Sequence, residues 1–151
     1  MRPSKATTFM RQAEIAAERS HDAETKVGSV LVKNDNSSLV ASGCNGFARG
    51  VDDNKLPTTR PLKYKYIIHS EENLVANCAH NGIVMANCTL YCTLTPCAKC
   101  MRLIYQAGVT CVVAKTKYRD FEELLQMDDL NIQEEPTEEG YVKLTYSPKH
   151  L

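Results

Sequence analysis

The chain has 151 residues, a length that suits one compact domain, residues 1–151, with its own hydrophobic core. Its 18 lysines and arginines balance 18 aspartates and glutamates, so we expect neither a nucleic-acid partner nor a membrane partner. Seven cysteines, an odd number, indicate reduced thiols. No apolar run has the length of a membrane span. Together these features predict a cytoplasmic protein, in the host cytoplasm if the source is viral.

The first half of the chain predicts a helix, a hairpin and a long loop. Apolar residues at helical spacing predict a helix over residues 7–19. Residues 27–32 and 39–42 are typical of strands, and the turn formers of residues 33–38 between them favour a hairpin. Residues 43–66 hold three glycines and two prolines without a sustained period, so we expect a loop of a length that is usually functional.

The second half alternates helices with strands. The predicted elements are a helix over 70–80, a strand over 89–94, a helix over 98–107, a strand over 110–114, a helix over 121–127 and a strand over 141–146. Gly82 and Gly108 follow the first two of these helices, where glycine commonly ends a helix. This order predicts a three-layer α/β domain that begins with a hairpin.

Charge is unevenly distributed along this neutral chain. Basic residues gather in the middle, at Arg49, Lys55, Arg60, Lys63 and Lys65, whereas residues 122–139 are rich in acids. A local basic stretch within a neutral total fits a small anionic ligand better than a polyanion. A solvated basic surface without a ligand is the alternative.

Two short motifs carry the chemistry. They are His69-Ser70-Glu71 and Pro96-Cys97-Ala98-Lys99-Cys100. One imidazole and two thiolates supply three ligands for Zn²⁺, and a catalytic zinc site with three protein ligands keeps its fourth position for water. Glu71 is suited to moving protons beside such a metal. The pattern H-x-E followed by P-C-x-x-C is typical of zinc-dependent nucleobase deaminases.

Both motifs are expected at the starts of helices. Cys97 and Cys100 lie three residues apart, so on a helix their sulfurs share a face. Pro96 favours a helix start that puts Cys97 in the first turn, where the helix dipole stabilises the thiolate that zinc requires. His69 directly precedes another predicted helix, so two helix N-termini could converge on one metal.

The chain resembles the deoxycytidylate (dCMP) deaminases of the cytidine deaminase superfamily over most of its length. The matching segments are K-V-G at 26–28, G-C-N-G-F-A-R-G-V-D-D at 43–53, H-S-E-E-N at 69–73, P-C-A-K-C at 96–100 and Q-A-G-V at 106–109. The resemblance implies a cytidine-deaminase-like α/β domain with a mixed central sheet and helices on both faces. It also implies zinc-dependent hydrolytic deamination of dCMP to dUMP, the precursor of dTMP, with Glu71 as the catalytic acid and base.

The resemblance assigns further residues to the substrate. Asn45 is expected to bind the deoxyribose, and Lys26 and Tyr118 are expected at the substrate phosphate. The sequence departs from the family's usual pattern at Glu72, where leucine is common, and at Cys44, where an aromatic residue is common. Neither change touches a predicted metal ligand or the acid and base.

Regulation is also implied by the resemblance. The family is known for control by deoxynucleoside triphosphates with Mg²⁺, dCTP activating and dTTP inhibiting, and for hexamers, so we expect a homo-oligomer. The effector site is expected in the long loop, at Asn45, Gly46, Phe47, Arg49, Gly50, Asp52 and Asp53. Backbone amides and the arginine could hold phosphates, and an aspartate could assist the Mg²⁺. A loop that only closes over the substrate is the alternative.

Other functions and other metal sites stay open at this point. An editing deaminase acting on tRNA or single-stranded nucleic acid would favour a basic face and stacking aromatics, which the neutral charge and the absence of tryptophan weigh against. A non-catalytic, zinc-stabilised binding domain would have no need of Glu71. A closed site of four thiolates, at Cys88, Cys92, Cys97 and Cys100, would leave His69 without a role.

Overall fold

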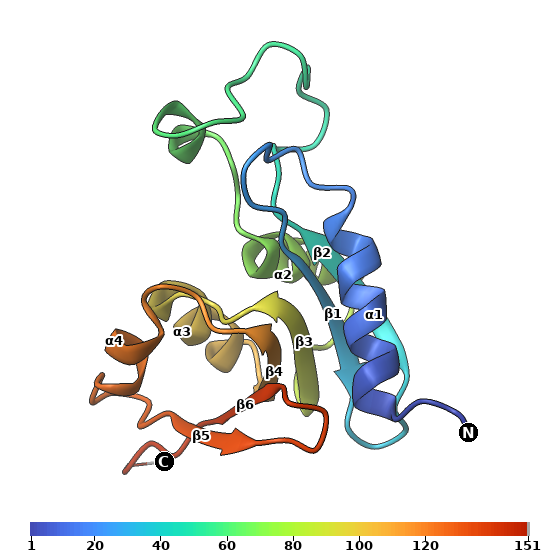
Figure 1. Ribbon diagram of the computed structural model, residues 1–151, viewed down its shortest axis with the longest axis vertical. Helices are drawn as coiled ribbons and strands as arrows, with labels where there is room; N and C mark the ends of the chain where they lie inside the picture. The colour runs from blue at the N-terminus through green and yellow to red at the C-terminus, as the bar shows by residue number, and fades with distance from the viewer. Residues whose placement is uncertain (151) are drawn as a thin grey trace.

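The computed structural model describes residues 1–150 as a sheet with helices packed on both of its faces (Figure 1). In chain order the elements are α1 (Lys5–Ala17), β1 (Gly28–Lys33), β2 (Leu39–Cys44), the short 3-10 helix η1 (Leu62–Lys65), α2 (Ser70–Asn81), β3 (Cys88–Leu94), α3 (Ala98–Gln106), β4 (Val109–Thr116), α4 (Phe121–Leu125), β5 (Gln133–Pro136) and β6 (Val142–Thr145).

The sheet is mixed and has six strands in the order β2-β1-β3-β4-β6-β5. β1 and β2 form the expected antiparallel hairpin, and β3 lies antiparallel to β1 on its other side. β3 and β4 are parallel, as the intervening α3 crossover requires. β6 then runs antiparallel to both β4 and β5. The predicted fold class, a three-layer α/β domain with a mixed sheet, is confirmed.

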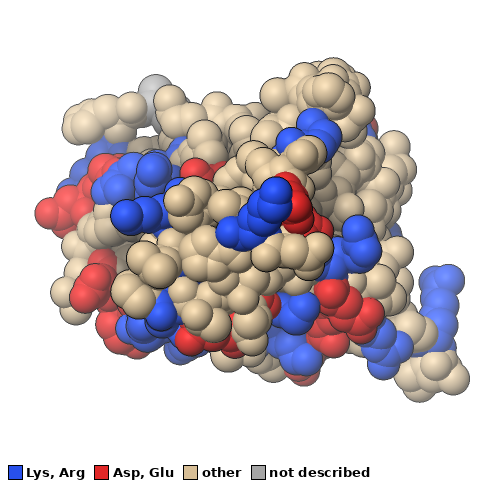
Figure 2. Space-filling model, turned by 90° about the horizontal axis from the view of Figure 1, so that it is seen from above, with Lys and Arg blue, Asp and Glu red and all other residues tan. Residues whose placement is uncertain are grey.

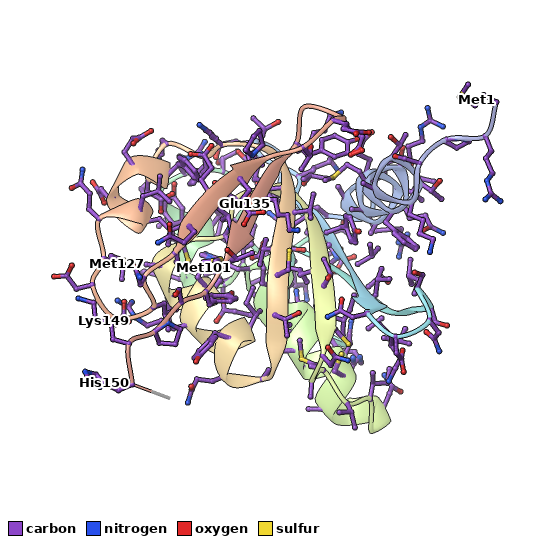
Figure 3. All side chains as sticks on the ribbon, turned by 90° about the horizontal axis from the view of Figure 1, so that it is seen from below. Met1, Met101, Met127, Glu135, Lys149 and His150 are labelled. Atoms are coloured by element: carbon purple, nitrogen blue, oxygen red, sulfur yellow. The ribbon has the colours of Figure 1, made fainter. Side chains whose placement is uncertain are left out.

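Two apolar cores lie on opposite faces of the sheet. On one face Met10 and Ala13 of α1 pack with Val30, Val32 and Val113. On the other face the larger core joins the sheet to α2, α3 and α4, and Met101, labelled in Figure 3, lies inside it. The two layers of helices bury both faces of the central strands, which is why the middles of β1 and β4 are short apolar runs, Val30–Val32 and Val112–Ala114.

The observed elements differ from the predicted ones in a few places. α1 begins two residues early, because the Ser4 hydroxyl accepts a hydrogen bond from the Thr7 amide at 3.1 Å and caps the helix. β5 was not predicted, because it is a short, exposed edge strand without apolar residues at alternate positions. The predicted long loop projects from one end of the sheet and contains η1 (Figure 1).

Charged side chains of both signs are interspersed over the face seen in Figure 2, in line with the neutral total. No helix within residues 1–150 combines the length and the apolar character that crossing a membrane demands.

Candidate active site

Two helix N-termini meet at the end of the sheet, as expected. His69 is the N-cap residue of α2 and Cys97 is the N-cap residue of α3, so Cys97 lies just before the first turn in which it was predicted. Cys100 lies in that first turn. The Glu72 carboxylate accepts a hydrogen bond from the His69 amide at 3.1 Å and holds the start of α2. Glu72, a departure from the family pattern, therefore acts as a capping residue.

Three side chains form a compact cluster of potential metal ligands. His69 Nδ1 lies 3.4 Å from Cys100 Sγ and 3.7 Å from Cys97 Sγ. One ligand atom from each residue lies within 4.8 Å of the others. In a tetrahedral zinc site, ordinary Zn–N and Zn–S bond lengths separate a nitrogen from a sulfur ligand by about 3.6 Å. The donor types and both measured separations therefore fit Zn²⁺.

The four-thiolate alternative has no support among the described side chains. Cys88 and Cys92 are fully buried in the apolar core of the sheet, and neither joins the cluster of ligand atoms within residues 1–150. Burial raises the pKa of Cys92 well above its ordinary value, as expected for an inert core thiol.

The electrostatic environment of the cluster favours a thiolate, which a metal cation requires as a ligand. A hydrogen bond from the Cys100 thiol, ahead of a bond with His69, lowers the pKa of Cys97 to about 4. Sharing that proton with Cys97, together with burial, raises the pKa of Cys100. The pair therefore favours the thiolate form at Cys97, and the N-termini of α2 and α3 both favour negative charge at this point.

Glu71 lies beside the cluster and is only 4% exposed. Burial, the dominant influence, raises the pKa of Glu71 to about 7. A carboxyl group with a pKa near neutrality can both accept and donate a proton at physiological pH. This arrangement places a proton carrier next to the candidate metal site.

The start of α2 is fixed by close packing against the hairpin. A Cβ on Gly43 would lie 2.8 Å from the Ser70 carbonyl oxygen, so only glycine lets β2 approach the helix this closely. The Ser70 hydroxyl donates to the Gly43 carbonyl at 3.1 Å and lies 2.8 Å from the buried Ser29 hydroxyl. Gly46 and Ile68 exchange two backbone hydrogen bonds of 3.0 and 2.8 Å, which close the long loop directly before the first candidate ligand.

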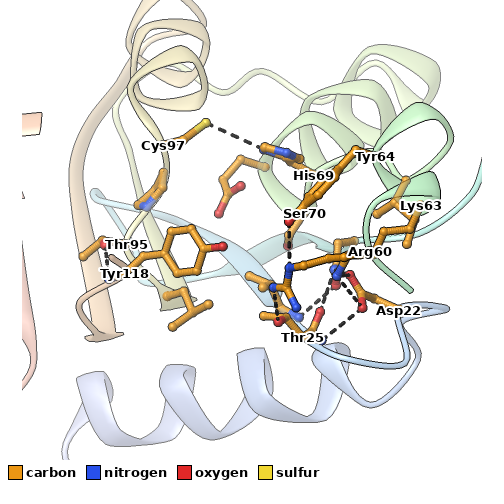
Figure 4. Close-up of a pocket in the computed structure, with 16 residues that line it drawn as sticks. Asp22, Thr25, Arg60, Lys63, Tyr64, His69, Ser70, Thr95, Cys97 and Tyr118 are labelled. Carbon is orange, nitrogen blue, oxygen red and sulfur yellow. Dashed lines mark hydrogen bonds and ion pairs between the residues drawn. The ribbon is translucent and has the colours of Figure 1, made fainter. Parts of the chain in front are cut away.

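A cavity extends from the cluster toward a polar wall (Figure 4). His69, Glu71 and Cys97 line it on the side of the cluster, and apolar side chains, among them Val27 and Ile67, also contribute to its lining. The polar wall consists of Thr25, Arg60, Tyr64 and Tyr118. The cavity thus joins a metal-type site to a basic, hydroxyl-bearing surface.

Arg60 is the centre of the polar wall. Its Nε donates to the Tyr64 hydroxyl at 2.7 Å, and its Nη2 donates to the Thr25 hydroxyl at 3.3 Å. Its Nη1 pairs with a Glu24 carboxylate oxygen at 3.1 Å. Sequence reasoning identified the basic stretch around this arginine as a site for a small anion but did not single out Arg60 or Tyr64.

The residues predicted to bind substrate divide between the cavity and the surface. Tyr118 and Asn45 line the cavity. The Asn45 side chain is already engaged, since its Oδ1 accepts from the Val27 amide at 2.8 Å and its Nδ2 donates to the Thr25 carbonyl at 2.8 Å. Lys26 points elsewhere, and its Nζ donates to the Ser20 carbonyl at 2.9 Å.

Most residues predicted to bind an effector lie outside the cavity. Phe47 stacks on His21 with the ring centroids 4.8 Å apart, and His21 Nε2 lies 3.2 Å from Asp53. Arg49 donates to the Asn77 side chain on α2 at 3.1 Å. Asp52 pairs with Lys55, and Gly50 lies at an exposed turn with φ of +87°. His21 anchors this loop, a role that its isolated position in the sequence did not indicate.

Comparison with known proteins places this geometry in context. A family model described as the cytidine and deoxycytidylate deaminase zinc-binding region matches residues 3–116. Deoxycytidylate deaminases of Mus musculus and Homo sapiens are 37% and 36% identical over 122 residues, which cover 76% of this chain and 67% of each relative. The crystal structure of dCMP deaminase from the cyanophage S-TIM5 in complex with dCMP and dUMP superposes with a TM-score of 0.67 at 31% identity, covering 83% of this chain and 93% of that chain. A cytidine deaminase from Burkholderia pseudomallei, at 17% identity and a TM-score of 0.53, shares the fold.

Proposed function

The chain belongs to the cytidine and deoxycytidylate deaminase family, and on that premise we propose that it hydrolyses dCMP to dUMP and ammonia, with zinc as its cofactor. The observation that carries the proposal is one cavity with a His–Cys–Cys cluster and a buried glutamate at one end and a basic, hydroxyl-bearing wall at the other. The cluster suits a deaminase, and the wall suits a phosphorylated substrate.

His69, Cys97 and Cys100 would hold the zinc, because their donor atoms and separations fit a tetrahedral site. When bound, zinc supplies the Lewis acidity that makes water a nucleophile near neutral pH. The start of α2 orients His69 through the cap at Glu72, so the ligand set is fixed before substrate arrives.

Glu71 would move the protons of the reaction. In the net change, the oxygen of water bonds to C4 of the cytosine ring and the amino group departs as ammonia. Glu71 accepts one proton from the attacking water and delivers it to ring nitrogen N3, and then carries the second proton of that water to the departing amino group, which leaves as ammonia. Its burial supports this role, because a pKa of about 7 suits both directions of transfer.

The polar wall would select the monophosphate. Arg60 offers a guanidinium, and the hydroxyls of Tyr64 and Tyr118, which also line the cavity, add neutral donors. An incoming phosphate carries more charge than the Glu24 carboxylate and would compete for the guanidinium by charge-assisted hydrogen bonds. Asn45 would meet the sugar between the wall and the metal.

Regulation by dCTP as activator and dTTP as inhibitor, with Mg²⁺ and in a homo-oligomer such as a hexamer, forms a second part of the proposal. The long loop supports it, because Asn45 joins the loop to the cavity while Arg49 and Asp52 lie outside it. A triphosphate that shifted this loop would alter dCMP affinity without entering the cavity.

Ammonia release from dCMP, deoxycytidine, dCTP and a cytosine-containing oligonucleotide tests the substrate class directly. The proposal expects dCMP to be the preferred substrate. A preference for the oligonucleotide would support an editing deaminase, and no turnover of any substrate by the zinc-loaded protein would support a binding domain.

A further inference from the structure

The cavity wall contains a buried ion pair that the proposed chemistry does not use. Lys63 and Asp22 are each 3% exposed, and Lys63 Nζ lies 2.8 and 3.0 Å from the two carboxylate oxygens of Asp22. A fully buried lysine is rare and needs such a partner. Apolar residues of similar volume often replace a buried ion pair without loss of stability, so stability alone does not account for this one.

Asp22 connects the turn after α1 to the end of β2. Its Oδ1 accepts hydrogen bonds from the amides of Glu24 and Thr25 at 2.8 and 3.0 Å. Its Oδ2 lies 3.4 Å from the Asn45 side-chain nitrogen. Burial by itself raises the pKa of Asp22, but the bonds from Lys63 and from these amides outweigh it and lower that pKa. The carboxylate is thus a junction of two segments that line the cavity.

Lys63 connects the same junction to η1 and the polar wall. Its Nζ also lies 3.4 Å from Glu24 Oε1. That oxygen accepts the backbone amide hydrogen of Arg60 at 2.6 Å, and the other carboxylate oxygen of Glu24 pairs with the Arg60 guanidinium. Through the Glu24 carboxylate, the pair is therefore connected to both the backbone and the side chain of Arg60, at the centre of the wall. Asp22, Lys63 and Arg60 are labelled in Figure 4.

An electrostatic role of Asp22 and Lys63 can be distinguished from a positioning role by the effect of each substitution on a bound anion. Asp22 and Glu24 carry two negative charges, which Lys63 and Arg60 balance. Loss of Lys63 alone leaves an extra negative charge near the wall, whereas loss of the Asp22 charge leaves an extra positive one. A purely electrostatic role therefore predicts opposite effects on a bound anion, and a positioning role predicts the same effect.

We propose that Asp22 and Lys63 are positioning residues that hold Arg60 and Tyr64 where a 5′-phosphate binds, and so determine selectivity for a nucleoside monophosphate over a nucleoside. The inference rests on the proposed deamination of dCMP. The two residues join three separate segments of the cavity wall, and the wall cannot keep its shape if the segments move apart.

The test compares Asp22→Asn, Lys63→Met and the double variant with the wild-type protein. Asp22→Asn keeps an oxygen that can accept from the Glu24 and Thr25 amides, and the double variant restores a neutral network, so what these variants remove is the link between Asp22 and Lys63. Each of the three variants should raise KM for dCMP and the dissociation constant of dUMP about tenfold or more, because small displacements of a binding group have effects of this size. Saturating kcat and zinc content should change less than about threefold.

The matched control makes the equivalent acid-to-amide and lysine-to-methionine substitutions at an exposed ion pair, Glu14→Gln with Lys115→Met, where Lys115 Nζ lies 2.8 Å from Glu14 Oε1. Leu144→Ala, in the core far along the sheet, controls for lower stability. The inference is overturned if Asp22→Asn tightens dUMP binding or if KM for dCMP stays unchanged in the double variant. It is also overturned if a rise in KM is accompanied by losses of kcat and zinc content in the proportion seen for Leu144→Ala. Failure of the wild-type protein to deaminate dCMP would overturn the proposed function instead, and dUMP binding compared with deoxyuridine binding would still test the pair.

Discussion

Replacing Glu71 with glutamine removes the proposed proton carrier while keeping the shape of the site. Glutamine has the same number of heavy atoms as glutamate and fills the same buried position at the start of α2. It cannot accept a proton at neutral pH. Because burial opposes the charged form of Glu71, a neutral side chain there should not lower the free energy of unfolding.

The expected loss follows from the position of Glu71 and its pKa. A positioned acid or base contributes roughly 100- to 10,000-fold to the rate, and it contributes most when its pKa lies near the working pH. With a pKa of about 7, Glu71 is near that optimum, so we expect kcat to fall toward the larger limit, about 5 kcal/mol of transition-state stabilisation. KM for dCMP and the zinc content should change little.

The assay is ammonia release from dCMP by the two proteins at equal zinc occupancy. Glu72→Gln is the matched control, because it makes the same chemical change one residue away and leaves an oxygen that can still accept the His69 amide hydrogen. Near wild-type turnover by Glu71→Gln would refute its role in proton transfer. A comparable loss in Glu72→Gln would mean that the start of the helix, not the acid, had been damaged.

Four further predictions concern the metal, the substrate, regulation and packing. Cys97→Ala and Cys100→Ala should each lose zinc, and full zinc content by elemental analysis in either variant would exclude that residue as a ligand. Arg60→Met should raise KM for dCMP about 10- to 100-fold with little change in KM for deoxycytidine, because charge-assisted hydrogen bonds are worth about 1.5 to 3 kcal/mol. An equal rise in KM for both substrates would mean that Arg60 contacts the sugar or supports the fold instead of the phosphate. Arg49→Ala should blunt dTTP inhibition and dCTP activation while sparing turnover at saturating dCMP, and wild-type saturation curves unaltered by either triphosphate would remove the regulatory proposal. Gly43→Ala should lower the free energy of unfolding by about 1 to 3 kcal/mol in urea denaturation, because the new Cβ would press on the backbone of α2. An unchanged urea midpoint would show that β2 and α2 can move apart without a loss of stability.

The metal cluster was predictable because its signals are local. A histidine before one helix and two cysteines three residues apart at the start of another fix most of the ligand geometry within each motif. The alternation of helices and strands then brings both helix starts to the same end of the sheet. The order of the strands in the sheet was not predicted, and β5 was missed altogether because it is short, polar and exposed.

The polar wall was less predictable because distant segments build it. Nothing in the sequence around Lys63 indicates that it is buried, since its partner Asp22 lies 41 residues earlier. Lys26 was expected at the phosphate from the family resemblance, yet its side chain bonds to the backbone of its own turn. Of the basic stretch, Arg60 and Lys63 line the cavity, and which members do so depends on how the long loop folds back.

The most direct test of the account is ammonia release by the purified wild-type protein, measured with dCMP, deoxycytidine, dCTP and a cytosine-containing oligonucleotide before and after removal of zinc. We expect turnover of dCMP to exceed that of every other substrate, to disappear with the metal and to return when Zn²⁺ is restored. Absence of dCMP turnover in the zinc-loaded protein, or undiminished turnover after the metal has been removed, would contradict the central claim.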